Sequence, residues 1–96
     1  MYDLKFPHKE YKISDKIIIW FWDDSSTNAK ELLDNNLFVC DSDYHELWNM
    51  KNVRKINDVC VALSVWKNSF YFCTFWGIGM EVDIHTLNVI NMIQTK

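Results

Sequence analysis

The fold is decided by the stretch Asn36-Leu37-Phe38-Val39-Cys40-Asp41-Ser42-Asp43-Tyr44-His45-Glu46-Leu47-Trp48, whose pattern returns in Met80-Glu81-Val82-Asp83-Ile84-His85-Thr86-Leu87-Asn88-Val89-Ile90. Each stretch reads as an apolar strand, an aspartate, a short turn and a second strand. An aspartate at this position accepts hydrogen bonds from backbone N–H groups two residues on and holds a tight reversal of the chain. The two stretches therefore predict β-hairpins, with Asp41, Asp43 and Asp83 as turn formers.

Further strands are predicted from short apolar runs rich in β-branched and aromatic residues. In Lys16–Trp22 large apolar side chains fall on both faces, which predicts a central strand. Val59–Trp66 places four aliphatic side chains on one face, and we expect this face to point inward: Val59, Val61, Leu63 and Val65. An N-terminal strand is expected at Leu4–His8 or Tyr11–Ile13.

The C-terminal half continues as a meander of antiparallel strands. Lys67-Asn68-Ser69 leads into a strand over Phe70–Trp76, and we expect Asn68 to adopt a positive φ in this turn. The chain has 2 glycines, Gly77 and Gly79, and their position predicts a bend or bulge rather than a phosphate-binding loop. The last hairpin returns as a strand over Leu87–Ile93.

The segment Ser25–Asp34 departs from the β pattern. It combines Ser/Thr cap candidates with good helix formers and is followed by Asn35, which predicts a short helix docked through Leu32 and Leu33. A looped excursion between two strands is the alternative. We therefore expect a mainly β protein, either a single antiparallel β-meander sheet or a small sandwich, with one short helix; an α+β fold is the alternative.

The length of 96 residues allows one domain, residues 1–96, with a small core rich in aromatic rings. The N-terminus lacks a basic region followed by an apolar one, so no secretory signal is expected. The longest apolar stretch, Phe70–Met80, is shorter than the roughly 18 residues of a membrane-spanning helix. We expect a soluble cytoplasmic protein. Its cysteines, Cys40, Cys60 and Cys73, are odd in number and indicate reduced, buried thiols.

Charge is distributed unevenly along the chain. Residues 23–46 contain seven acids and one lysine, whereas residues 51–67 contain four basic residues and one acid. Acids beside exposed rings suit a basic protein partner, because complementary potential speeds encounter while buried rings supply affinity. The same acids disfavour binding to nucleic acid, whose phosphates they repel. The candidate partner-binding residues are Trp22, Asp23, Asp24, Asp34, Asp41, Asp43, Tyr44, Glu46 and Trp48.

Each candidate also has a purely structural interpretation. Asp41 and Asp43 can serve as turn formers, and Asp23 and Asp24 can end a strand and cap the helix. Most of the aromatic residues must fill the core, because a domain of this size has little else to fill it. We expect only a few of them to contact a partner.

Metal binding and catalysis are not indicated. His8, His45 and His85 lie far apart in the sequence and outside ligand spacings. Asp41 and Asp43 resemble the start of a calcium loop, but the glycine and glutamate of that loop are absent. A triad of Ser64, Asp83 and His85 can be imagined, but no nucleophile elbow accompanies it. We expect no cofactor, no metal and no enzymatic activity.

Two groups of residues resemble small bacterial immunity proteins of contact-dependent inhibition or polymorphic toxin systems. The first is Asn36-Leu37-Phe38-Val39-Cys40-Asp41 with Glu46-Leu47-Trp48-Asn49-Met50, preceded by Trp22-Asp23-Asp24. The second, Phe70–Asp83 followed by Thr86-Leu87-Asn88-Val89-Ile90, is similar to their closing hairpin. The resemblance implies a cytosolic antidote that binds a toxin.

The sequence-based hypothesis is therefore a protein that binds and neutralises a cognate toxin, a basic nuclease, through an acidic and aromatic patch. The alternative is a non-catalytic subunit or adaptor of a cytosolic complex, which binds through an aromatic face or a β edge. A small hydrolase ranks last. Homo-oligomers through a β edge are compatible with both leading hypotheses.

Overall fold

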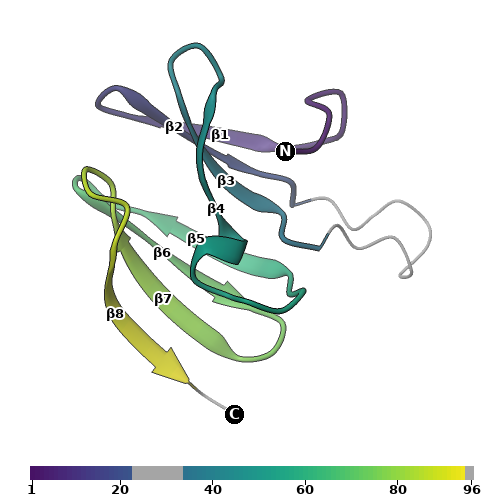
Figure 1. Ribbon diagram of the computed structural model, residues 1–96, viewed down its shortest axis with the longest axis vertical. Coiled ribbons are helices and arrows are strands. Elements are labelled where there is room, and N and C mark those ends of the chain that lie inside the picture. Colours follow the sequence, from purple (N-terminus) through teal and green to yellow (C-terminus); the bar gives the residue numbers. More distant parts are fainter. Residues whose placement is uncertain (23–33, 95–96) are drawn as a thin grey trace.

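The computed structural model describes residues 1–22 and 34–94, which form two antiparallel four-stranded sheets (Figure 1). Sheet A has the order β1 (Lys9–Ile13), β2 (Lys16–Trp20), β3 (Leu37–Asp41) and β4 (Glu46–Asn49). Sheet B has the order β5 (Cys60–Val65), β6 (Ser69–Thr74), β7 (Ile78–Asp83) and β8 (Val89–Gln94). A 3₁₀ helix, η2 (Met50–Asn52), follows β4. The mainly β meander is confirmed, and β1 lies at the second of the two predicted N-terminal positions.

The two sheets share one apolar core, so the fold is the small sandwich. Inner-face side chains of both sheets contact each other there: Ile18, Leu37, Val39 and Trp48 from sheet A, and Phe70, Phe72, Met80 and Val82 from sheet B. The ring of Trp48 lies edge-on to the rings of Phe70 and Phe72, with centroids 5.4 and 6.0 Å away. Edge-to-face ring pairs of this kind add about 0.5–1.5 kcal/mol to the free energy of area burial.

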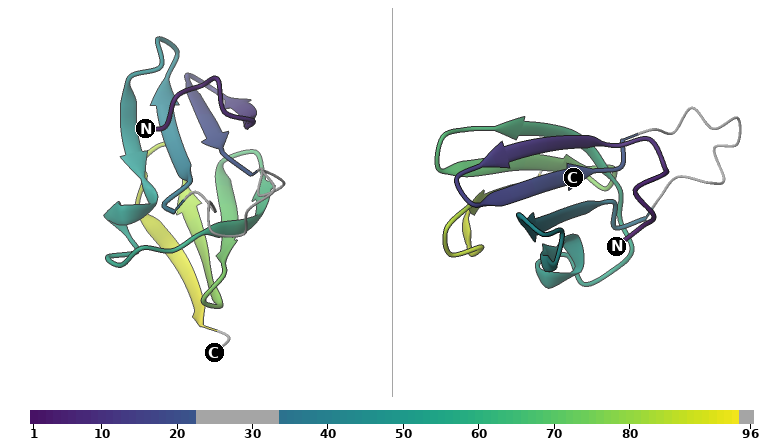
Figure 2. Two further views of the ribbon diagram at one scale, coloured as in Figure 1. Left: turned by 90° about the vertical axis from the view of Figure 1, so that its right-hand side faces the viewer. Right: turned by 90° about the horizontal axis from the view of Figure 1, so that it is seen from above.

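The outer face of sheet A carries a second, smaller apolar cluster. Its members are Ile17, Ile19, Phe21, Phe38 and Cys40, with Tyr2 packed against them. The N-terminal residues run from β1 toward the β3–β4 hairpin across this face (Figure 2). Because clusters cover both of its faces, β2 is buried at Ile17–Ile19, and its interior position between β1 and β3 confirms the predicted central strand.

A buried polar junction links the two sheets. The side chain of Asn36 donates to the carbonyl oxygens of Phe21, at 2.8 Å, and Cys60, at 3.1 Å. Its Oδ1 accepts from the backbone N–H of Cys60 at 2.7 Å, and Trp20 Nε1 donates to the same Cys60 carbonyl at 3.1 Å. Since Phe21 follows β2 and Cys60 begins β5, these bonds connect sheet A to the first strand of sheet B.

Both hairpin predictions hold, but the inward face predicted for β5 is wrong at Val61. The register shifts between Cys60 and Ala62, so Val61 is a bulge residue and is 51% exposed. Cys60 enters the core in its place, and Leu63 and Val65 pack against the core beyond the bulge. A bulge changes the alternation of side chains between the two faces by one residue, which the sequence pattern does not reveal.

Two further predictions need comment. Asn68 does not adopt a positive φ; among the described residues other than glycine, the positive φ values belong to Ser14, Asn35, Tyr44 and Leu87. The predicted helix over Ser25–Asp34 lies outside the described residues, except for Asp34, which is in a turn.

Gly77, with φ of 85°, forms the predicted bend between β6 and β7. All three cysteines are free, and Cys40 and Cys60 are buried as expected, whereas Cys73 is only half-buried because it follows the core residue Phe72 on β6 and so lies on the outer face.

Candidate partner-binding surface

The β3–β4 turn is held by the carboxylate of Asp41. Its Oδ1 accepts from the backbone N–H groups of Asp43 and His45, both at 2.9 Å, and its Oδ2 lies 3.1 Å from Nδ1 of His45. The bond from the His45 backbone, followed by that from Asp43, lowers the pKa of Asp41. Asp41 therefore forms the turn as predicted and also keeps a negative charge there. Asp43 lies exposed at the tip.

Tyr44 connects this turn to strand β1. With φ of 65°, it is in the left-handed region, and its side chain is 42% exposed. Its hydroxyl donates to Oε1 of Glu10 at 2.8 Å, while Oε2 of Glu10 lies 2.9 Å from Nε2 of His8. The hydrogen bonds from His8 and then Tyr44 lower the pKa of Glu10. Glu10 is thus a fixed, ionised carboxylate beside the hairpin.

Glu46 brings a third carboxylate to the same face. Its Oε1 lies 3.1 Å from the Met1 ammonium group, and its Oε2 accepts from Asn49 Nδ2 at 3.0 Å. Partial burial opposes ionisation, but the bonds from Asn49 and the Met1 ammonium outweigh it and lower the pKa of Glu46.

The three carboxylates lie around one point, the thiol of Cys40. Burial raises the pKa of Cys40 to about 11, and the negative charges of Glu46, Asp41 and Glu10 add to this effect. Glu10 and Glu46 pair with the outer-face residues Ile19 and Cys40, and Asp41 ends β3 next to Cys40, so strands β1, β3 and β4 contribute acids to one region of sheet A. We call Glu10, Asp41, Asp43 and Glu46 the acidic patch.

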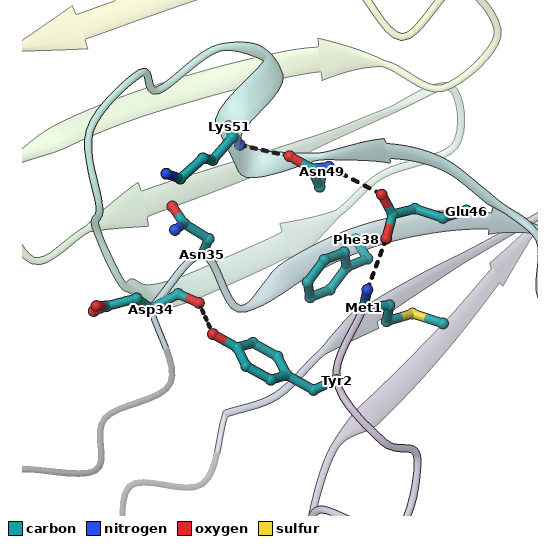
Figure 3. Close-up of a pocket in the computed structure, with 8 residues that line it drawn as sticks. All are labelled: Met1, Tyr2, Asp34, Asn35, Phe38, Glu46, Asn49 and Lys51. Atoms are coloured by element: carbon teal, nitrogen blue, oxygen red, sulfur yellow. Dashed lines mark hydrogen bonds and ion pairs between the residues drawn. The ribbon is translucent and has the colours of Figure 1, made fainter.

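An open hollow borders the acidic patch (Figure 3). The residues that line it are Met1, Tyr2, Asp34, Asn35, Phe38, Glu46, Asn49 and Lys51. The Tyr2 hydroxyl donates to the carbonyl oxygen of Asp34, and the Lys51 backbone N–H donates to Asn49. Asp34 and Glu46 both line the hollow. The hollow contains charges of both signs, and several of its polar groups hydrogen-bond to each other.

The structure brings together only part of the predicted surface. Asp41, Asp43, Tyr44 and Glu46 lie on one hairpin, as expected. Asp34 precedes β3 and so lies at the opposite end of that strand from Asp41. Asp23 and Asp24 lie outside the described residues.

Trp22 does not join the acidic patch. It follows β2 at the end of sheet A that lies away from the β3–β4 turn, and it is 43% exposed. The Lys9 ammonium lies 5.4 Å from its ring centroid and 5.8 Å from that of Trp20. Within residues 1–22 and 34–94, the charged group that lies over the Trp22 ring is therefore a cation.

Trp48 is a correction. It was predicted as a binding anchor, but its side chain is 3% exposed and lies in the shared core. The reason is a bulge: Val39 pairs with Trp48 and Cys40 with Glu46, so Leu47 is the extra residue. Leu47 is 47% exposed and is the apolar side chain that β4 presents to solvent.

Glu10 and Leu47 are the residues that sequence reasoning missed. Glu10 belongs to a segment that carries more lysines than acids, so counting charge by segment placed it outside the acidic region. Only the pairing of β1 with β2 and of β2 with β3 brings it to the hairpin. The positions of acids and turn residues in the sequence do not indicate that Glu10 lies near the hairpin or that Leu47 is exposed.

Metal and catalytic arrangements gain no support from the geometry. Ligand atoms of Asp41, Asp43 and His45 lie within 4.8 Å of one another, but Asp41 is already bonded to the turn backbone and the group is exposed. Asp83 accepts from the backbone of His85 and Thr86, as a turn former. Within residues 1–22 and 34–94, no hydrogen bond joins Ser64 to His85 or Asp83.

Comparison with models of protein families, with curated proteins and with solved structures gave no significant match. Among the described residues, no helix has the length and apolar character needed to cross a membrane. The surface itself therefore carries the functional argument.

Proposed function

We propose that this protein binds and neutralises a cognate toxin in the cytosol, and that the toxin is a basic nuclease. The observation that supports this function is the acidic patch, in which four carboxylates from β1 and the β3–β4 hairpin lie near one another: Glu10, Asp41, Asp43 and Glu46. Tyr44 and Leu47 lie exposed beside them as apolar anchors.

The patch is suited to rapid and tight binding of a cationic protein. Glu10, Asp41 and Glu46 are ionised at neutral pH, and their lowered pKa values extend this charge to more acidic pH. Hydrogen bonds within the protein hold these carboxylates in place, so little conformational entropy is lost when a partner binds. Opposite charges speed the encounter, and desolvated rings at the centre supply the affinity.

Neutralisation follows from competition for the toxin's substrate site. A nuclease holds substrate phosphates with arginine and lysine side chains. An array of carboxylates offers these side chains the same charge and the same acceptor chemistry as phosphate oxygens. The hairpin then occupies the cationic groove and excludes the nucleic acid, and no catalytic step by the antidote is involved.

The proposal is tested by co-expression with the toxin encoded next to this protein, with growth and the dissociation constant as readouts. We expect the native protein to protect the cells. Asp43→Lys combined with Tyr44→Ala should weaken binding at least about tenfold, because a charge and a ring are removed from the contact. Glu81→Lys gives the charge change of Asp43→Lys on sheet B and should bind normally.

Two results would contradict the proposal. One is native protein that neither protects nor binds the neighbouring toxin. The other is equal loss of binding in Glu81→Lys and in the hairpin variant, both shown by thermal unfolding to be folded. That result would indicate a general charge effect rather than contact with the acidic patch.

One observation favours the alternative, a non-catalytic subunit or adaptor of a cytosolic complex. Three aromatic side chains of the sheet B half are more than half exposed, namely Trp66, Phe75 and Trp76. Solvent-exposed rings are common anchors for protein partners. If Phe75→Ser and Trp76→Ser abolish binding of a copurifying partner while the hairpin variant retains it, the adaptor function replaces the antidote function.

A further inference from the structure

Strand β8 is an open and apolar edge of sheet B. It pairs with β7 alone, and it carries no charged side chain. Four of its apolar side chains are exposed by 37–60%: Val89, Ile90, Met92 and Ile93. In Figures 1 and 2 its C-terminal end extends beyond the part of sheet B that sheet A covers.

Both faces of β8 present apolar side chains to solvent. Met92 pairs with Met80, whose side chain is buried in the core, so Met92 points to the inner side of the sheet. Ile93 pairs with Gly79 and points to the outer side. Met92 is 60% exposed and Ile93 is 49% exposed. A ligand on one face would cover only one of them, whereas an adjacent strand with its own flanking side chains covers both.

The other three sheet edges carry features that oppose strand addition. Strand β1 has charged side chains at Lys9, Glu10 and Lys12. Strand β4 is 4 residues long and contains the Leu47 bulge, and β5 contains the Val61 bulge. Charges, short length and bulges are the usual protections of edge strands. In β8 the bulge lies at Ile90, near its start, and Asn91–Gln94 keeps a regular register.

We propose that β8 pairs antiparallel with β8 of a second copy of this chain, so that the two B sheets form one continuous sheet. The uncharged edge offers no complement to a charged partner strand, and two such edges do not repel each other. Among the edge strands that the structure describes, β8 offers a second copy an uncharged stretch without a bulge, Asn91–Gln94. A twofold axis closes the assembly at two copies, because each copy then has no further β8 to offer.

The symmetry fixes which residues meet. When the axis is normal to the sheet, opposed residues must point to the same face, so residues of equal parity pair. When the paired stretch is centred within Asn91–Ile93, one of these three residues lies opposite its own copy. A cysteine at that position would be opposite a second cysteine at the short distance of a cross-strand pair.

Sedimentation velocity across a range of concentrations tests the dimer. We expect the native protein to sediment as twice the 11.5 kDa chain. Met92→Lys with Ile93→Lys should weaken self-association at least about tenfold, because four lysines would meet at the joined edge. Val61→Lys is the matched control, since Val61 is 51% exposed on the opposite edge of the same sheet, and it should remain dimeric.

Cross-linking provides a second measurement that does not depend on the lysine variants folding. In a Cys73→Ser background, single cysteines at positions 91, 92 and 93 are oxidised at low protein concentration. We expect one of them to give a covalent dimer, and Val61→Cys to give none. A monomeric native protein, a dimer unaffected by the β8 lysines, or cross-linking through position 61 alone would overturn the proposal. None of these outcomes bears on toxin binding by the acidic patch.

Discussion

Single side chains decide whether the β3–β4 hairpin can both fold and bind. Asp41 uses its carboxylate to close the turn and carries a charge of the acidic patch at the same time. Tyr44 and Trp48 lie four residues apart on this hairpin, but one is exposed and the other is in the core. Substitution at these two positions should therefore separate binding from stability.

Replacing Trp48 with alanine should lower the free energy of unfolding by about 3–5 kcal/mol, because the cavity removes contacts with Phe70 and Phe72. Replacing Tyr44 with alanine should cost clearly less, because its side chain is exposed and its loss leaves no cavity in the core. Urea unfolding followed by far-UV circular dichroism measures both. Similar costs for the two changes would contradict the assignment of Trp48 to the core.

The ion pair of His8 and Glu10 should stabilise the protein only within a limited pH range. The carbonyl of Phe6 and then Glu10 raise the pKa of His8 above 6.5, so its contribution to stability is complete below that pH and is lost as pH rises. The pKa of Glu10 is lowered from 4.5, so its contribution is complete above that pH and is lost on acidification. Both contributions are present between pH 4.5 and 6.5.

The variant His8→Gln should therefore lose most stability relative to the native protein between pH 4.5 and 6.5, and less on either side. Thermal unfolding in a series of buffers measures this difference. Glu10→Gln should show the same loss between pH 4.5 and 6.5 but keep part of it above pH 6.5, because it also removes the charged acceptor of the Tyr44 hydroxyl. A difference that does not change with pH would show that the ion pair contributes nothing to stability.

At the scale of elements, Gly79 in β7 leaves room on the outer face of sheet B for the Tyr71 side chain of the neighbouring strand β6. A Cβ atom on Gly79 would lie 2.9 Å from Cζ of Tyr71 and closer still to its hydroxyl oxygen. The Tyr71 ring is stacked on Trp66, with centroids 6.4 Å apart and an interplanar angle of 8°. A shift of the Tyr71 ring away from position 79 would change its contact with Trp66.

Gly79→Ala should accordingly destabilise the native protein by about 1–3 kcal/mol. In a Tyr71→Ala background the same change should be neutral or stabilising, because alanine in a strand is favoured over glycine by roughly 0.5–1 kcal/mol. A double-mutant cycle from urea unfolding measures the reversal. Equal costs in the two backgrounds would mean that Tyr71 is not what Gly79 accommodates.

The hairpins could be predicted from the sequence because the chemistry of Asp41 and Asp83 is local. Their side chains bond to backbone groups only two to four residues away. The bulges at Leu47 and Val61 could not be predicted, since an extra residue is defined only by the partner strand. The errors at Trp48 and Val61 both follow from this, because a bulge exchanges which side chain faces the core.

The acidic patch could be predicted where it lies on one hairpin and not where it depends on sheet pairing. Asp41, Asp43 and Glu46 are close in sequence, so they remain close in space. Glu10 reaches them across two strand pairs, and Asp34 is separated from Asp41 by the length of β3. Local charge counts carry no information about such pairings.

At the scale of the whole molecule, the shared core implies that the two sheets unfold together. The residues that cover sheet A on its inner side come from sheet B, including Phe70, Phe72 and Val82. If sheet B unfolded, this face of sheet A would be exposed to water, and a four-stranded sheet with one bare apolar face is not stable alone.

Unfolding should therefore be a single two-state transition. Amide exchange of β2 and β3 in sheet A should coincide with amide exchange of β6 and β7 in sheet B as urea increases. Tyr71→Ala, an outer-face change, should leave the coincidence intact. Separate midpoints for the two sheets would contradict a common core.

The junction at Asn36 determines how one sheet is positioned on the other. Aliphatic and aromatic contacts are non-directional and change little when layers slide by a fraction of a residue. The two bonds between the Asn36 side chain and the Cys60 backbone, at 3.1 and 2.7 Å, are directional, and both are lost if the layers shift. The core can thus accept substitutions of similar volume while the bonds of Asn36 and Trp20 to Cys60 keep the two sheets aligned. Surface variation on either sheet can then proceed without moving the opposite surface.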